Sequence, residues 1–131
     1  MAIPARILIV DDEPFVRDSL AEFLEDYNFD VSRASSAEEA LEILSKGEFH
    51  VAIVDLRLPG MSGDMLIINA HKKQPGMRFL IHTGSEDYRL PGELESIGIS
   101  EAHLFYKPVT DLHLFIDSIE KLLIGVQSSD D

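Results

Sequence analysis

The stretch Arg6–Pro14, RILIVDDEP, sets a run of aliphatic residues directly against three adjacent acids. Its first part, Arg6–Val10, is typical of a buried strand. Asp11, Asp12 and Glu13 then carry like charges, which repel one another by roughly 1–4 kcal/mol per pair, depending on the local dielectric. Acids crowded at the end of a core strand are tolerable when a cation lies between them. The stretch therefore predicts a buried sheet with a charged site at its edge.

Short apolar segments alternate with helical patterns along the rest of the chain. Strands are predicted at 6–10, 29–34, 50–56, 77–83 and 102–106. Patterns with apolar residues three and four positions apart predict helices at 16–27, 36–44, 64–73 and 91–97, and a last helix capped by Thr110. This alternation predicts an α/β fold, a doubly wound five-stranded parallel sheet in the order 2-1-3-4-5, flavodoxin-like, with helices on both faces.

Composition limits the possible functions. The chain has 131 residues, no cysteine and a formal net charge of −13, so thiolate chemistry is excluded and direct nucleic-acid binding is disfavoured. No apolar run is long enough to cross a membrane, and the N-terminus lacks a signal-peptide pattern, so a cytoplasmic location is expected. Residues 1–125 are expected to form one domain, and 126–131 a short acidic tail or the start of a linker.

Polar side chains follow four of the predicted strands, at the point where each strand ends. Asp11 and Asp12 follow the first strand, Asp55 closes the third, Thr83 the fourth, and Lys107 comes after the fifth. Because ligands of such sheets bind beyond the carboxyl ends of the strands, these groups are expected to converge. An all-oxygen set of acids suits Mg²⁺ or Mn²⁺. A carboxylate beside a metal, a cation and a hydroxyl can attack phosphorus and become an aspartyl phosphate.

At these residues the chain resembles the receiver domain of bacterial two-component response regulators, along almost its whole length. The segments that carry the resemblance are ILIVDDEP, VAIVDLRLPGMSG, HTGS and FYKPV. The resemblance implies that Asp55 accepts a phosphoryl group. It also implies that Asp11, Asp12, Asp55 and the backbone carbonyl of Arg57 hold Mg²⁺ (or Mn²⁺), and that Lys107 contacts the phosphoryl group.

The resemblance further implies a signalling domain, not an enzyme acting on other substrates. The Lys107–Pro108 peptide is expected to be cis. Thr83 is expected to switch the surface of the fourth helix, fifth strand and fifth helix, and Arg57 and Ser85 are expected to tune the dephosphorylation rate. The implied partners are a histidine kinase or histidine phosphotransfer protein and a downstream protein partner or output domain, with no nucleic acid or membrane contacted directly.

Two features depart from the family pattern. Leu104 stands where the family usually has an aromatic residue that follows the movement of the threonine. Because side chains alternate along a strand, Tyr106 points the same way, and the hypothesis is that Tyr106 replaces that aromatic residue, unless coupling proceeds without one. The fourth helix is expected to begin near Pro91 and to last only about two turns, after a loop over residues 84–90.

Three other functions compete with this interpretation. A receiver-like interaction module that signals without phosphorylation stays open. A small-molecule phosphatase or phosphotransferase with an aspartyl-phosphate intermediate needs an acid two residues after the nucleophile, where this chain has Arg57. A flavin carrier of the same topology needs a loop rich in Ser, Thr or Gly after the first strand, where this chain has acids. Of the five histidines, only His82 is expected near the site.

Overall fold

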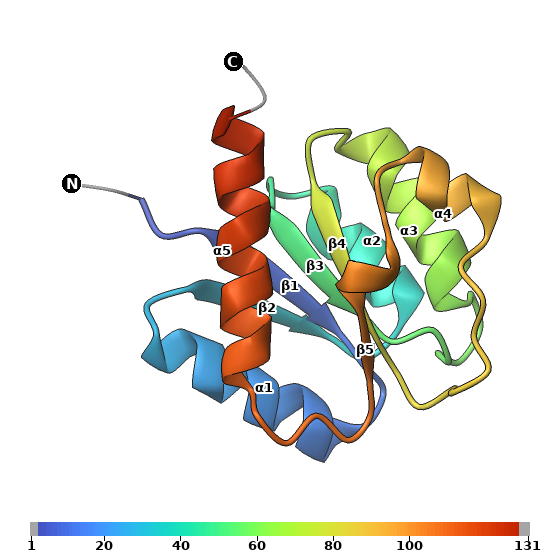
Figure 1. Cartoon of the computed structure of the whole chain (residues 1–131), viewed down its shortest axis with the longest axis horizontal. Helices are drawn as coiled ribbons and strands as arrows, with labels where there is room; N and C mark the ends of the chain where they lie inside the picture. The colour runs from blue at the N-terminus through green and yellow to red at the C-terminus, as the bar shows by residue number, and fades with distance from the viewer. Residues whose placement is uncertain (1–2, 129–131) are drawn as a thin grey trace.

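Five parallel strands form one sheet in the order β2-β1-β3-β4-β5, as predicted (Figure 1). The structure is a computed structural model that describes residues 3–128, with side chains described through residue 124. The strands are β1 (Arg6–Val10), β2 (Asp30–Ala34), β3 (Val51–Val54), β4 (Arg78–Thr83) and β5 (Leu104–Tyr106). The helices are α1 (Pro14–Asp26), α2 (Ala37–Leu44), α3 (Gly63–Lys73), α4 (Gly92–Ser96) and α5 (His113–Ser128), with a 3₁₀ turn, η1, at Glu101–His103.

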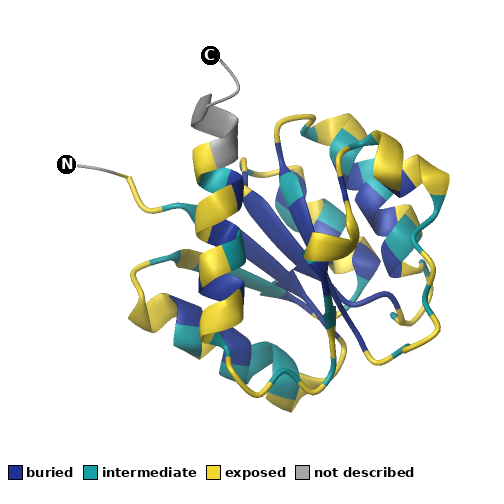
Figure 2. Ribbon diagram, viewed as in Figure 1, coloured by how far each residue is buried: buried dark blue, intermediate teal, exposed yellow. Residues whose placement is uncertain are grey.

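The burial of each strand follows its place in the sheet (Figure 2). Every residue of β3 is buried, and so is all of β1 and β4 except the first residue of each. The edge strands β2 and β5 are only partly buried. Strands covered on both faces need continuous apolar runs, which is why the sequence of the central strands lacks polar alternation.

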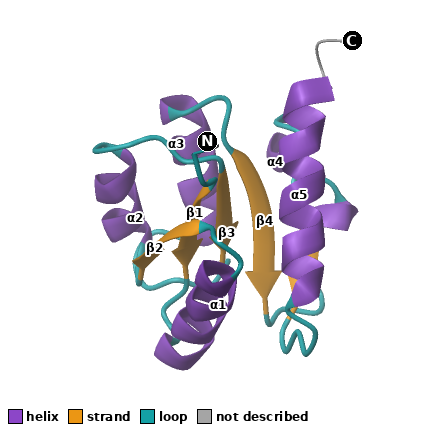
Figure 3. Ribbon diagram, turned by 90° about the vertical axis from the view of Figure 1, so that its left-hand side faces the viewer, coloured by secondary structure: helices purple, strands orange, loops and turns teal. Residues whose placement is uncertain are grey.

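Helices cover the two faces of the sheet separately. Side chains of β1, β3 and β4 alternate between the faces, so Ile7, Ile53 and Leu80 pack with α1 and α5 around Phe115. The opposite face packs against α2, α3 and α4. In Figure 3 the sheet is seen between α2 and α3 on one side and α5 on the other. None of the described helices is long and apolar enough to cross a membrane.

Several predicted element boundaries are off by one or two residues, and the starts of the fifth strand and of the last helix show why. The fifth strand begins at Leu104, because the residues before it form the turn η1, in which His103 Nδ1 accepts a hydrogen bond from the Ser100 amide (2.9 Å). The last helix begins at His113, and its first amide donates to the side chain of Asp111 (3.1 Å), not to Thr110. In both places a local side-chain hydrogen bond decides where regular structure starts.

The fourth helix begins where Pro91 predicts, with Pro91 as the N-cap residue, but it is shorter than expected at five residues. The loop before it is fixed by Tyr88, whose hydroxyl donates to Asp64 Oδ1 in α3 (2.8 Å). At the other end of the chain, α5 extends to Ser128, past the predicted domain boundary at residue 125. Residues 129–131 of the predicted tail lie outside the described residues.

Candidate functional site

The expected site residues lie together at the carboxyl ends of the strands because the backbone hydrogen bonds of the sheet continue one residue past them. The amide of Asp11 donates to the last residue of β2 (3.1 Å), and the amide of Asp55 donates to the last residue of β1 (2.9 Å). In the same way, the amide of Lys107 donates to the carbonyl of Thr83 (2.7 Å). Three of the expected site residues are thereby held by backbone hydrogen bonds to neighbouring strands of the sheet.

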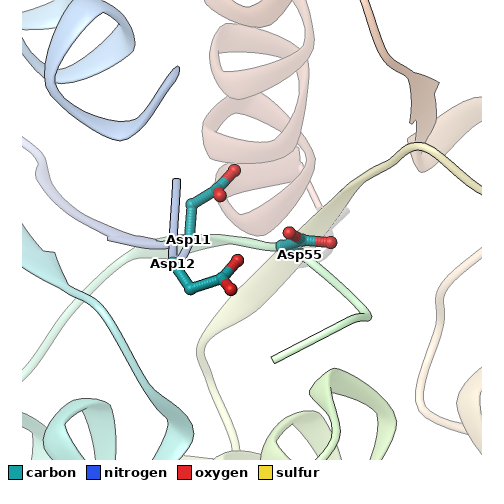
Figure 4. A group of neighbouring side chains, drawn as sticks. All are labelled: Asp11, Asp12 and Asp55. Carbon is teal, nitrogen blue, oxygen red and sulfur yellow. The ribbon is translucent and has the colours of Figure 1, made fainter. Parts of the chain in front are cut away.

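Three carboxylates from two strand ends form a compact cluster (Figure 4). Asp11, Asp12 and Asp55 each offer an oxygen within 4.8 Å of the others. Asp11 and Asp55 are only 2% and 4% exposed, whereas Asp12 is exposed. Burial raises the pKa of Asp11, although hydrogen bonds from the Glu13 amide and Lys107 oppose this. An all-oxygen cluster that is open on one side fits a hard divalent cation such as Mg²⁺.

Lys107 donates to three carboxylates at once. Its Nζ lies 2.7 Å from Glu13 Oε1, 3.0 Å from Asp11 Oδ2 and 3.1 Å from Asp55 Oδ2. Desolvation acts to lower the pKa of Lys107, but the bonds to Glu13 and Asp11 outweigh it and raise the pKa above its ordinary value. The Lys107–Pro108 peptide is cis, as expected. The side chain is therefore a fixed positive charge against the carboxylates.

The backbone behind Asp55 is supported by a close approach of α3. The amide of Gly63 donates to the carbonyl of Leu56 (3.0 Å), and a Cβ atom at Gly63 would lie 2.3 Å from the Asp55 carbonyl oxygen. Only glycine fits in this space. This role of Gly63 was not predicted from the sequence, although the residue stands out in PGMSGD as a glycine at the start of a helix.

A cleft of about 300 Å³ opens above the cluster, lined by Asp12, Glu13, Asp55, Arg57, Gly84 and Lys107. The amide of Arg57 donates to Asp55 Oδ1 (3.1 Å), so both oxygens of Asp55 have hydrogen-bond donors. Thr83 is fully buried, and its Oγ1 accepts from the amide of Ser85 (3.1 Å). The structure thus brings Arg57 and Lys107 into the cleft, and Thr83 and Ser85 flank Gly84, which also lines it.

A second, mostly apolar hollow of about 630 Å³ lies beside the cleft, between α1 and the segment after β5. Phe15, on its rim, is 83% exposed, and His82 lies at its wall against Phe115 (ring centroids 5.0 Å apart). His82 Nε2 is buried without a hydrogen-bond partner in the described part of the chain. Burial, and then the charge of Lys107, lower the pKa of His82 to about 4.

Because of His82, acidification from about pH 6.5 to about pH 4 is expected to destabilise the fold. The unfolded chain takes up a proton at His82 below about pH 6.5, whereas the folded chain resists it until about pH 4. Stability is therefore present above pH 6.5 and is lost progressively down to pH 4, by about 3 kcal/mol from this residue. Urea unfolding at several pH values measures it. His82→Leu should remove this part of the pH dependence, and equal slopes for the two proteins would contradict the assignment.

Residues 7–116 match the sequence pattern of the response regulator receiver domain. The chain belongs to this family. Among solved structures, this receiver domain is similar to a CheY-like receiver domain from Methanospirillum hungatei (30% identity, TM-score 0.85, covering 97% of this chain and 99% of that one). It is also similar to TrrA of Thermotoga maritima in complex with Mg²⁺ and beryllium fluoride (28% identity, TM-score 0.76, covering 90% and 98%).

The curated relatives of this receiver domain are longer proteins. The uncharacterized transcriptional regulatory protein YesN of Bacillus subtilis is 27% identical over 95% of this chain but only 34% of its own length. The regulatory protein VanR of Enterococcus faecium is 45% identical over 44% of this chain and 25% of its own length. The chain thus spans about a third or less of these two relatives.

The two residues on which the switching hypothesis rests lie on the α4 side of β5. Leu104 is 9% exposed and belongs to the core on that side, whereas Tyr106 is 40% exposed. Phe105 points to the opposite face, where it stacks on Phe115 (ring centroids 4.5 Å apart). Tyr106 is therefore the exposed aromatic residue of β5, whereas Phe105 is only partly accessible.

Proposed function

We propose that this receiver domain accepts a phosphoryl group on Asp55. The observation that carries the proposal is the setting of this carboxylate at the cleft. Asp55 is buried, and each of its two oxygens accepts a hydrogen bond. The backbone amide of Arg57 donates to one and the ammonium group of Lys107 to the other, and Arg57 and Lys107 also line the cleft. A response regulator from Burkholderia pseudomallei, 25% identical over 96% of this chain with a TM-score of 0.78, contains a phosphorylated aspartic acid.

Asp11, Asp12 and Asp55, with the backbone carbonyl of Arg57, are the residues that would hold Mg²⁺. The three carboxylates meet within 4.8 Å without a histidine or cysteine among them, which favours Mg²⁺ or Mn²⁺ over softer metals. Such a metal, when bound, would offset the charge of the acids and of the phosphoryl oxygens. TrrA was solved with Mg²⁺ and the Burkholderia protein with a calcium ion, and these two relatives support the proposal that this receiver domain binds a divalent cation.

The chain's own residues supply the rest of the chemistry. An oxygen of Asp55 forms the new bond to phosphorus while the bond from phosphorus to the donor's histidine nitrogen breaks, and the imidazole leaves. Lys107, already 3.1 Å from Asp55 Oδ2, can hold a phosphoryl oxygen as a point charge. Arg57 lies in the cleft and Ser85 two residues past Thr83, from where they would tune the rate of dephosphorylation.

The signal would leave the site through Thr83. In this structure the hydroxyl of Thr83 accepts a hydrogen bond from the Ser85 amide. On phosphorylation the hydroxyl would turn to donate to a phosphoryl oxygen. Losing the bond to Ser85 would then free the loop after β4 to move. That loop carries Tyr88, which donates a hydrogen bond to Asp64 and packs against the hydrophobic core on the face of the sheet that α4 covers. The surface of α4, β5 and α5 would change with it, and a downstream protein or an output domain would bind the changed surface.

Tyr106 is expected to couple the loop to α4. If it replaces the missing aromatic residue at Leu104, then Tyr106→Ala should reduce the amide chemical-shift changes of α4 on adding beryllofluoride by about half. Changes around Asp55 should stay the same, because the variant leaves the site intact. Equal changes at α4 in the variant and the wild type would mean that coupling proceeds without an aromatic residue.

A donor protein that brings a phosphohistidine to Asp55 has to contact the rim of the cleft, and Phe15 is the exposed apolar residue on the neighbouring hollow. We therefore expect Phe15→Ala to slow phosphotransfer from a histidine kinase or phosphotransfer protein by about tenfold. Transfer from acetyl phosphate should not change, because this small donor does not need the hollow. Ile124→Ala, an exposed apolar residue of α5, is the control, and equal slowing by both variants would contradict a docking role of Phe15.

Intact-mass measurement tests the proposed function directly. The chain is incubated with acetyl phosphate and Mg²⁺, with and without EDTA. The expected result is one added phosphoryl group that requires the metal. If the wild type gains no phosphoryl group and does not bind beryllofluoride, the receiver domain instead acts as an interaction module without phosphorylation.

A further inference from the structure

We propose that Glu13 is a positioning residue that acts as a gate on Lys107. It holds the ammonium group of Lys107 until a phosphoryl group arrives, and its charge slows phosphorylation by small anionic donors. The inference rests on the proposed phosphorylation of Asp55 and adds a residue that controls its rate.

The geometry around Lys107 places Glu13 between its ammonium group and the solvent. The bond from Nζ to Glu13 Oε1 is the shortest of its three contacts, at 2.7 Å. Glu13 is 94 residues away in sequence, and its side chain is 57% exposed, so it approaches the ammonium group from the solvent side. Asp11 and Asp55 approach from the buried side. Glu13 therefore occupies the contact of Lys107 that is most accessible to an incoming anion.

Glu13 lies outside the set of carboxylates that a metal would use. The cluster of oxygens within 4.8 Å contains Asp11, Asp12 and Asp55 but not Glu13. Two of the three acceptors of Lys107 are thus proposed metal ligands, whose charge a cation would offset. Glu13 is the one acceptor of the three that is not a proposed metal ligand, so its charge would stay available to Lys107 when a metal is bound. A phosphoryl oxygen that reaches Lys107 from the cleft therefore competes with Glu13 for the ammonium group and is repelled by its carboxylate.

The side chain of Glu13 contributes little else to the fold. It is the N-cap residue of α1, yet its side chain makes no capping hydrogen bond. Ion pairs at exposed positions add little to stability. Glu13 does line the cleft with Asp12 and Asp55, where its charge acts directly on an incoming anion.

The test compares Glu13→Gln with the wild type and with Glu22→Gln. Glu22 lies on the same helix and is exposed, so the control makes the same change of net charge away from the cleft. Glu13→Gln should be phosphorylated by acetyl phosphate about fivefold faster at low salt, and should bind beryllofluoride more tightly by a similar factor. Both differences should shrink in high salt, because screening weakens the repulsion. Glu22→Gln should match the wild type.

A second readout does not need the reaction. In nuclear magnetic resonance spectra, the Lys107 side-chain signal should move on adding beryllofluoride with Mg²⁺, and the spectrum before addition should already differ between Glu13→Gln and wild type. If the variant and the wild type are phosphorylated at equal rates, or if the variant is slower, the gate is overturned and the proposed function stands. If neither protein gains a phosphoryl group or binds beryllofluoride, the proposed function fails and the gate fails with it.

Discussion

Replacing Asp55 with asparagine is expected to leave no detectable phosphoryl adduct. The asparagine side chain has nearly the same shape, and its carbonyl oxygen can still accept from Arg57 or Lys107, which donate to the two oxygens of Asp55. It lacks the negative oxygen that attacks phosphorus, so the nucleophile is lost while the packing is kept. Intact mass after incubation with acetyl phosphate and Mg²⁺ measures the effect, which should exceed about 10³-fold in rate.

Asp12→Asn is the matched comparison for this experiment. Asp12 belongs to the same cluster but is exposed and makes no contact with Lys107 in the described structure. This variant should need more Mg²⁺ and still take up a phosphoryl group when Mg²⁺ is raised. Adduct formation by Asp55→Asn as fast as by the wild type would show that another residue is the acceptor.

Replacing Gly63 with alanine is expected to destabilise the fold by about 3 kcal/mol, because overpacking against fixed backbone is costly. The new Cβ would lie 2.3 Å from the Asp55 carbonyl oxygen and 2.7 Å from the Leu56 Cα. These neighbours are backbone atoms of the segment that leaves β3, so they cannot rotate away. Either α3 or the backbone of Asp55 has to move, and phosphorylation should fall as well. Urea unfolding and the acetyl phosphate assay measure the two effects.

Gly92→Ala is the control for a glycine at the start of a helix. Gly92 begins α4 as Gly63 begins α3, but a Cβ there would have no atom within 4 Å. Alanine favours helix over glycine, so this variant should be as stable as the wild type or slightly more stable. If Gly63→Ala were also neutral, the close packing of α3 on Asp55 would not hold in solution.

The architecture of this receiver domain could be predicted because it depends on patterns that are local in the sequence. The apolar run of β3 indicates a strand covered on both faces, and α1 and α5 show helical spacing. Where the prediction erred, at the starts of β5 and α5, single hydrogen bonds of His103 and Asp111 decide the boundary. Such bonds have no periodic signal.

The convergence of Asp11, Asp12, Asp55 and Lys107 was predictable for the same reason. Each residue directly follows a strand, and parallel strands in one sheet end at the same edge. The order of strands and the position of each residue therefore suffice to bring these side chains together. No knowledge of loops or side-chain conformations is needed.

The sequence by itself thus determined the sheet, its two helical layers and the acids and lysine at its edge, because hydrophobic spacing and strand ends are encoded over a few residues. Only the tertiary structure decided three contacts. Glu13 forms an ion pair with Lys107, Gly63 packs against the backbone of Asp55, and the hydroxyl of Tyr88 donates a hydrogen bond to Asp64. Each of these contacts joins a loop or a helix start to a distant element. Their geometry depends on how far helices shift along the sheet, which no local pattern specifies.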